Sequence, residues 1–164
     1  MALLVKQLRL KFLELIPLIL LLFISLNGSS IINIAFFSFN LHYILIYFWV
    51  LRKPQALSYG YIFLCGIITD VVFGFPIGVT ALTLLIISAV AAYVRAVTVR
   101  ISLMTDWISF IPALLIANFF NYMSLYFLDY NIDYLYLLKN SVFTFIFYPI
   151  LWGLFSLILN LTKS

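Results

Sequence analysis

The amino-acid sequence predicts an all-α integral membrane protein, a compact bundle of about six transmembrane helices with both termini in the cytoplasm. Of its 164 residues, 66% are hydrophobic and only 9% are charged, whereas a soluble globular domain carries roughly 25% charged residues. The apolar residues form long runs rather than short alternating stretches, which favours membrane helices over a β-barrel. Short connections join the runs without repeats or low-complexity tracts, so we expect a single polytopic domain over residues 1–164.

Six apolar runs are each close to the roughly 20 residues that a helix needs to cross a bilayer. Charged or turn residues separate them, and they cover residues 12–27, 31–51, 57–73, 77–95, 107–128 and 141–160. The basic stretch before the first run is typical of a signal peptide, but SLNG at residues 25–28 matches a small-x-small cleavage site poorly. We therefore expect the first helix to be retained.

The basic residues predict the orientation of the bundle. If all six runs cross the membrane, eight of the nine Lys and Arg residues fall on one side. They are Lys6, Arg9, Lys11, Arg52, Lys53, Arg95, Arg100 and Lys163. Only Lys139 falls on the other side, so the positive-inside rule predicts cytoplasmic termini. The net charge of +4 also favours contact with anionic membrane lipid, and it gives no reason to expect nucleic-acid binding.

One carboxylate lies within GIITDVVFGFPIGVTAL, residues 66–82. Asp70 is expected about one turn from the outer end of the third run. Gly74, Pro76 and Gly78 are expected to form a tight turn into the fourth run. A carboxylate near a helix C-terminus opposes the helix dipole, whereas the free N–H groups at the start of the next helix favour it. We expect Asp70 to hold this turn closed; a contact with a partner helix or an ion, and a proton relay, stay open as alternatives.

The connection between the fifth and sixth runs, Asp129 to Asn140, reads DYNIDYLYLLKN. Aromatic side chains prefer the membrane–water boundary, so its tyrosines fit an aromatic belt. The same residues also fit an interfacial hairpin on which an outer partner docks, with Tyr130 and Tyr134 facing that partner.

Few other polar side chains lie within the runs. Asn118 and Asn121 are expected to form hydrogen bonds between helices, each worth on the order of 1 kcal/mol. His42 is expected to be a packed, neutral, hydrogen-bonded imidazole, and the lone Cys65 a small buried hydrophobe. The chain has no Ser/His/Asp set beyond His42, no Cys/His metal spacing and no glycine-rich phosphate loop. We therefore expect no enzyme activity, no metal and no cofactor.

Two stretches of the chain carry a family resemblance. YFWVLRKP, residues 47–54, is an aromatic-rich helix that ends in a basic-Pro turn. GYIFLCGIITDVVFGFPIGVTALTLLIISAVAAYVR, residues 60–95, contains Gly-x5-Gly-x3-Asp-x3-Gly-x-Pro-x-Gly and then an Ala-rich helix ending in Arg. In this order they resemble the bacterial rod shape-determining protein MreD family. Phe39-Asn40 departs from that family, in which Pro often precedes Asn or Asp, so a short or broken helix beginning near Asn40 is the alternative for the second run.

The resemblance implies a component of the cell-elongation machinery in the bacterial inner membrane. It implies a compact six-helix fold similar to the substrate-binding components of ECF-type vitamin transporters. The implied partners are MreC and, through it, the actin-like MreB, the RodA glycosyltransferase and a penicillin-binding transpeptidase. The expected role is a non-enzymatic scaffold for lateral peptidoglycan synthesis, in which the turn that Asp70 closes faces a partner.

Two other functions remain as alternatives. A small-molecule transporter component would have a cavity among the third to sixth runs, lined by Asn118, Asn121 and Tyr122. An intramembrane enzyme would require Asp70 and His42 to meet, and the deeper position expected for His42 disfavours that.

Overall fold

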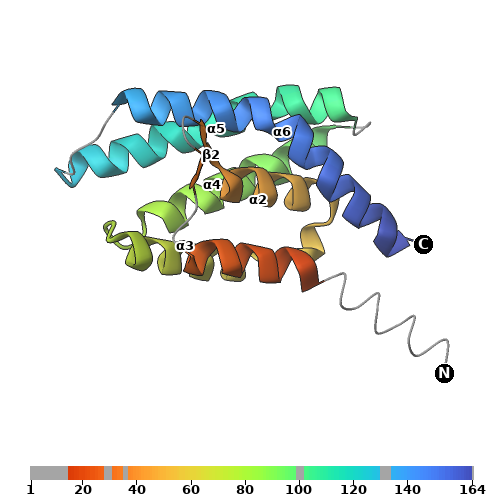
Figure 1. The fold of residues 1–164 in the computed structure, drawn as a ribbon, viewed down its shortest axis with the longest axis horizontal. Coiled ribbons are helices and arrows are strands. Elements are labelled where there is room, and N and C mark those ends of the chain that lie inside the picture. Colours follow the sequence, from red (N-terminus) through yellow and green to blue (C-terminus); the bar gives the residue numbers. More distant parts are fainter. Residues whose placement is uncertain (1–14, 28–30, 35–36, 99–101, 130–133, 164) are drawn as a thin grey trace.

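A computed structural model describes residues 15–27, 31–34, 37–98, 102–129 and 134–163. The described residues form six α-helices, a two-stranded hairpin and a 3-10 turn, η1 (Figure 1). In chain order these are a first helix at Leu15–Leu26, β1 Ile31–Ile34, β2 Phe37–Asn40, α2 Leu41–Arg52, η1 Pro54–Ala56, α3 Tyr59–Phe73, α4 Val79–Val97, α5 Leu103–Phe127 and α6 Tyr134–Lys163. Within this part of the chain, α4, α5 and α6 are long and apolar enough to cross a membrane.

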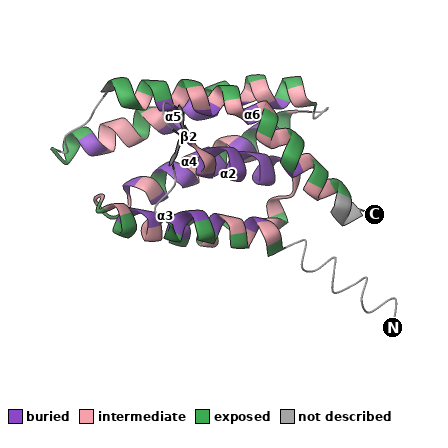
Figure 2. Ribbon diagram, in the orientation of Figure 1, coloured by how far each residue is buried: buried purple, intermediate pink, exposed green. Residues whose placement is uncertain are grey.

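The helices stack in three layers around α2. Figure 1 shows α5 and α6 together on one side, α2 and α4 in the middle, and the first helix and α3 on the other side. Every residue from His42 to Leu51 is buried, and Figure 2 shows α2 as the buried centre of the bundle. A helix that is apolar on all sides is stable only when other elements surround it. At 12 residues α2 is about 18 Å long, too short to cross a bilayer core of about 30 Å alone.

The expected helix over residues 31–51 is wrong in its first half. β1 pairs with β2 in an antiparallel register that sets Ile31 opposite Asn40 and Ile34 opposite Phe37. Isoleucine and phenylalanine suit strands as well as helices, so apolarity alone did not distinguish the two. The alternative start near Asn40 is confirmed, because Asn40 is the N-cap of α2 and its side chain accepts from the Tyr43 N–H at 3.4 Å.

The hairpin is joined to α6, which satisfies part of its backbone. The Asn40 N–H donates to the Thr144 hydroxyl at 2.8 Å, and the rings of Phe39 and Phe147 stack with centroids 4.7 Å apart. Non-helical backbone at membrane depth is stable only where protein covers it.

The expected loop over Asp129–Asn140 is also wrong in part, because α6 begins at Tyr134. Tyr130 and the side chain of Tyr134 lie outside the described residues. The alternative of an interfacial hairpin is therefore replaced, over residues 134–140, by the first two turns of a helix. The other expected runs agree better: α3, α4 and α5 begin and end within four residues of the boundaries predicted for them.

Proline residues interrupt the two longest helices. Pro112 lies within α5 and Pro149 within α6. In Figure 1, α6 runs beside α5 and then changes direction, so that its C-terminal half passes across the end of α2. Proline lacks an N–H and its ring crowds the preceding turn, which is the usual cause of such a bend.

Candidate functional site

The turn between α3 and α4 is built on the backbone of Asp70. Gly74 follows α3 in the left-handed conformation, with φ of 68°. The Phe75 N–H donates to the Asp70 carbonyl at 2.9 Å, and the Gly74 N–H to the Val71 carbonyl at 3.4 Å. This pair of bonds is the Schellman arrangement, which glycine favours because it has no Cβ to clash.

The side chain of Asp70 closes the same turn. It is fully buried, and its two carboxylate oxygens accept from the Gly78 N–H at 2.8 Å and the Thr80 N–H at 2.9 Å. Gly78 is the N-cap of α4, with φ of 103° and no side chain of its own to cap the helix. Asp70 thus caps α4 from α3, as the sequence predicts for the turn. Whether this turn also contacts a partner stays a prediction.

Close backbone contact supports this turn from within the helix pair. A Cβ added to Gly66 would overlap the Ala81 Cα and lie 2.8 Å from the Ala81 backbone nitrogen. Only glycine allows α3 and α4 to approach this closely, in line with the role of small residues in membrane helix packing. Pro76 completes the loop and its carbonyl accepts from the Val79 N–H at 3.3 Å.

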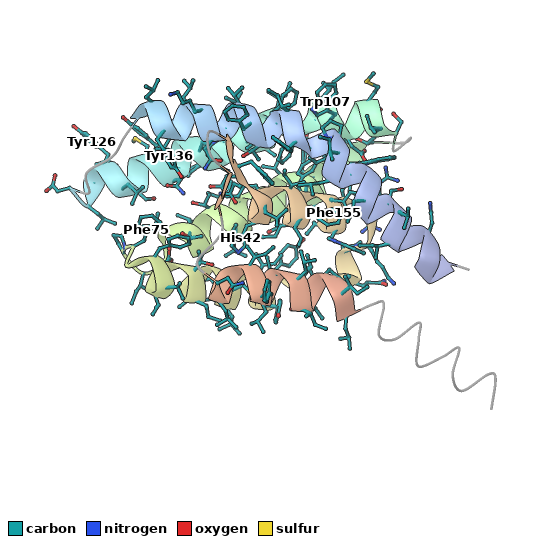
Figure 3. All side chains as sticks on the ribbon, in the orientation of Figure 1. His42, Phe75, Trp107, Tyr126, Tyr136 and Phe155 are labelled. Atoms are coloured by element: carbon teal, nitrogen blue, oxygen red, sulfur yellow. The ribbon has the colours of Figure 1, made fainter. Side chains whose placement is uncertain are left out.

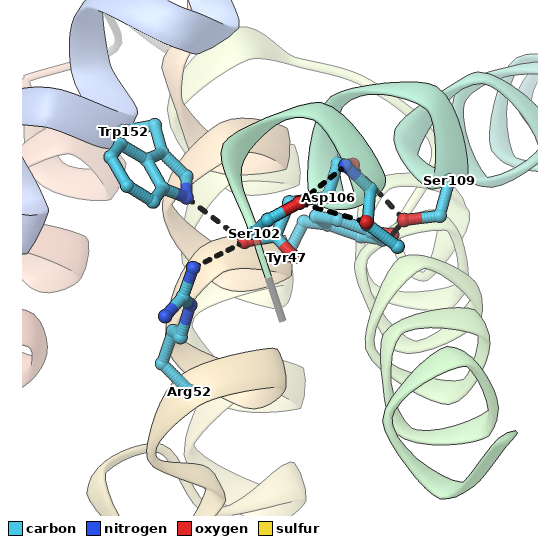
Figure 4. A network of polar contacts seen from close by, with 7 residues as sticks. Tyr47, Arg52, Ser102, Asp106, Ser109 and Trp152 are labelled. Atoms are coloured by element: carbon cyan, nitrogen blue, oxygen red, sulfur yellow. Dashed lines mark hydrogen bonds and ion pairs between the residues drawn. The ribbon is translucent and has the colours of Figure 1, made fainter. Parts of the chain in front are cut away.

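A second buried carboxylate, Asp106, was missed by sequence reasoning. It lies in the first turn of α5 and is 1% exposed. One of its oxygens, Oδ2, accepts from Arg52 Nη2 at 2.7 Å and from Trp152 Nε1 at 2.9 Å (Figure 4). Arg52, Asp106 and Trp152 therefore join the end of α2, the start of α5 and the second half of α6. We refer to these three residues as the Asp106 cluster.

Aromatic rings surround the guanidinium of the Asp106 cluster. The Arg52 Cζ lies 5.3 Å from the ring centroid of Trp152 and 5.9 Å from that of Phe48. The Tyr47 hydroxyl donates to the Ser109 hydroxyl at 2.8 Å, and Ser109 in turn donates to the Asp106 carbonyl at 3.0 Å. A buried ion pair gains stability only when such additional contacts offset its desolvation.

The predicted topology contains one indication of the Asp106 cluster. Six spans place Arg52 and Asp106 on the same side of the membrane. An acidic and a basic residue at helix ends on one side are candidates for an ion pair. Sequence spacing gave no direct hint, because the two residues are 54 positions apart.

The polar residues expected within the spans make packing contacts. Asn118 donates to the Ser141 hydroxyl at 2.8 Å, which links α5 to α6. Asn121 lies 3.5 Å from the Tyr43 hydroxyl of α2. The imidazole of His42 is buried, as expected. Its Nε2 is hydrogen-bonded to the Ser25 hydroxyl at 3.0 Å. Asp70 and His42 bond to different partners.

The described residues contain no group of three or more His, Cys, Asp or Glu side chains that could hold a metal ion. The buried ionisable groups instead connect one helix to another. The three candidate spans indicate a multi-pass helical membrane protein.

Comparison with protein-family models, curated proteins and solved structures found no match to this chain. The resemblance to the MreD family therefore stays a prediction from the residues.

Proposed function

We propose that this protein is a non-enzymatic membrane scaffold of the MreD type, which binds MreC and thereby positions wall synthases during cell elongation. The observation that carries the proposal is the use of the two buried carboxylates. Asp70 and Asp106 are both occupied by contacts that fix one segment of the chain against another. Charges committed in this way favour a rigid bundle over a reaction site.

The proposed topology has six membrane segments, cytoplasmic termini and a location in the bacterial inner membrane. α4, α5 and α6 supply three of the segments. The hairpin and the buried α2 together would form the second segment, since α2 alone is too short. In Figure 3, Phe75, Tyr126 and Tyr136 lie toward one end of the bundle, while Trp107 and Phe155 lie toward the other. We assign the first of these ends to the outer face, because Arg52 belongs to the opposite end.

The outer end offers the surface for MreC in this proposal. Ile77, in the turn that Asp70 closes, is 73% exposed, and Phe127 at the end of α5 is 74% exposed. Large apolar side chains at the end of a bundle, beside the membrane boundary, suit contact with another protein. MreC, MreB, RodA and the transpeptidase would then assemble around a fixed platform.

Photo-cross-linking in membranes tests the proposal. A photo-reactive residue at Ile77 or at Phe127 is expected to capture MreC or a wall synthase. The matched control is Leu115, a side chain within α5 that is 66% exposed and that we expect to capture lipid. Failure at both end positions, with the protein folded and abundant, would remove the outer end as the partner site and count against the scaffold.

A small-molecule transporter component is the alternative. It would need Asn118 and Asn121 to face a ligand, but both side chains contact other helices instead. We therefore prefer the scaffold. Binding of a metabolite to the purified protein at micromolar concentration or below would reverse this preference.

A further inference from the structure

The two halves of α6 are held to the bundle in different ways. The first half is tied by polar contacts with two elements. Ser141 bonds to Asn118 of α5, the Thr144 hydroxyl accepts from the Asn40 N–H, and the Phe145 carbonyl accepts from Trp107 Nε1. The second half follows Pro149 and packs mainly through apolar side chains on one face: Leu151, Phe155, Ile158 and Leu159.

We call residues 150–160 the C-terminal arm. Trp152 is the member of the Asp106 cluster that belongs to the arm, and it donates to Asp106 Oδ2. Phe155 adds contacts with the rings of Phe48 and Trp49, at centroid distances of 5.4 and 6.5 Å. These contacts all lie on α2 or at the start of α5, so the arm is fixed at the end of the bundle that holds Arg52.

The start of the arm is suited to bending. Pro149 cannot donate to the Phe145 carbonyl, so the helix lacks one of its own hydrogen bonds there. Gly153 follows one turn later, and a Cβ built on it would meet nothing within 4 Å. Packing therefore does not require glycine at this position, and glycine lowers the stability of a helix interior.

The arm also covers Arg52. The Trp152 ring lies against the guanidinium, whose side chain is only 22% exposed although Arg52 ends α2. Arg52 and Trp152 both donate to Asp106 Oδ2 without bonding to each other, so the bond of Arg52 does not require Trp152. Movement of the arm would thus expose one face of a fixed positive charge.

We propose that the C-terminal arm is a hinged element that swings about Pro149, and that the bond from Trp152 to Asp106 holds it closed over Arg52. The proposal concerns regulation of access to Arg52 and is independent of the scaffold function. It rests on the bend, the different attachment of the two halves of α6, and the shared acceptor on Asp106.

Distances between two spin labels test the hinge in the full chain. One label is placed at Gln55, which is exposed in η1, and the other at Leu157, which is exposed on the arm. Cys65 is replaced by alanine so that only the introduced cysteines react. In Trp152→Phe a smaller aromatic ring replaces the indole and the N–H is lost. We expect a longer-distance population to grow roughly tenfold relative to the closed one, as for loss of a hydrogen bond to a charged group. Gly153→Ala, which meets no steric obstacle, is expected to reduce that population.

A second label pair and a second variant keep the outcome decisive. The second pair of labels is placed at Leu115, exposed in the middle of α5, and at Leu138, exposed in the half of α6 that precedes Pro149. Their distance should be the same in every variant that folds. If Trp152→Phe alters this pair, Trp152→Leu replaces it, because leucine also lacks the N–H and leaves the bond between Arg52 and Asp106 in place. A single distance between Gln55 and Leu157, equal in the parent and in the folded variant, would show a rigid bend and overturn the proposal.

Discussion

Trp107 donates its indole N–H to the Phe145 carbonyl at 2.9 Å, and this is the carbonyl that Pro149 leaves without its helical donor. The rings of Trp107 and Phe145 also stack, with centroids 5.0 Å apart. A proline in a membrane helix is tolerated when a neighbouring helix satisfies the freed backbone group. α5 thus supplies the hydrogen bond that α6 cannot make for itself.

Trp107→Phe is expected to destabilise the protein by about 1 kcal/mol, because an aromatic ring can still stack but the partly buried Phe145 carbonyl loses its donor. The measurement is unfolding in detergent micelles. In a Pro149→Ala background, residue 149 regains an N–H for the Phe145 carbonyl, so the same change should cost much less. Equal costs in both backgrounds would mean that the indole bond does not serve the proline.

Asp70→Ala is expected to cost about 2 kcal/mol, since the N–H groups of Gly78 and Thr80 lose their acceptors at the start of α4. Asp70→Asn keeps one acceptor oxygen, so its stability should lie between those of the parent protein and Asp70→Ala. Thermal unfolding measures the structural role, and co-purification of MreC measures the proposed partner role. Normal values in both assays would remove Asp70 from the site.

Gly66→Ala is expected to cost roughly 1–3 kcal/mol, because its new methyl group would overlap the Ala81 backbone. Gly60→Ala, in the same helix, is the matched control, as a Cβ there meets nothing within 4 Å. Alanine favours the helix more than glycine does, and this gain is larger at Gly66, inside α3, than at Gly60 in its first turn. A loss of stability at Gly66 alone would therefore come from the contact with α4. Similar stabilities for the two variants would contradict the close approach of α3 and α4.

Arg52→Met is expected to destabilise the bundle by about 3–5 kcal/mol, because it leaves the Asp106 carboxylate buried without its ion-pair partner. Adding Asp106→Asn should recover a large part of the loss, since the unpaired charge is removed as well. The control is Arg95→Met, which changes an exposed charge. No recovery in the double variant would indicate that Arg52 acts through packing on Phe48 and Trp152 instead of through its charge.

Local sequence features predicted the part of the candidate site whose partners are close in the chain. The turn after Asp70 was predictable because glycine, proline and a carboxylate within nine residues leave few alternatives. The Asp106 cluster was not, because its three members come from three helices and meet only after those helices pack.

The errors in the fold have a similar physical cause. Residues 31–34 and 37–40 belong to a stretch apolar enough for a membrane helix, and only their pairing with each other and the contact with α6 show that they are strands. The start of α6 was placed seven residues late because tyrosines, Lys139 and Asn140 mark the membrane boundary. A helix does not have to end where the hydrocarbon ends.

The two buried carboxylates also differ in when their partners become available during synthesis. Asp70 bonds to groups 8 and 10 residues further along, whereas Trp152 follows Asp106 by 46 residues. We expect α3 and α4 to enter the membrane as one helical hairpin that completes its own polar contacts. A chain that ends after Asp129 should still protect the Gly78 and Thr80 amides from hydrogen exchange; rapid exchange would refute this order. Asp106 can bond to Arg52 as soon as α5 is inserted. Its second donor, Trp152, becomes available only when α6, the last helix described, has been synthesised.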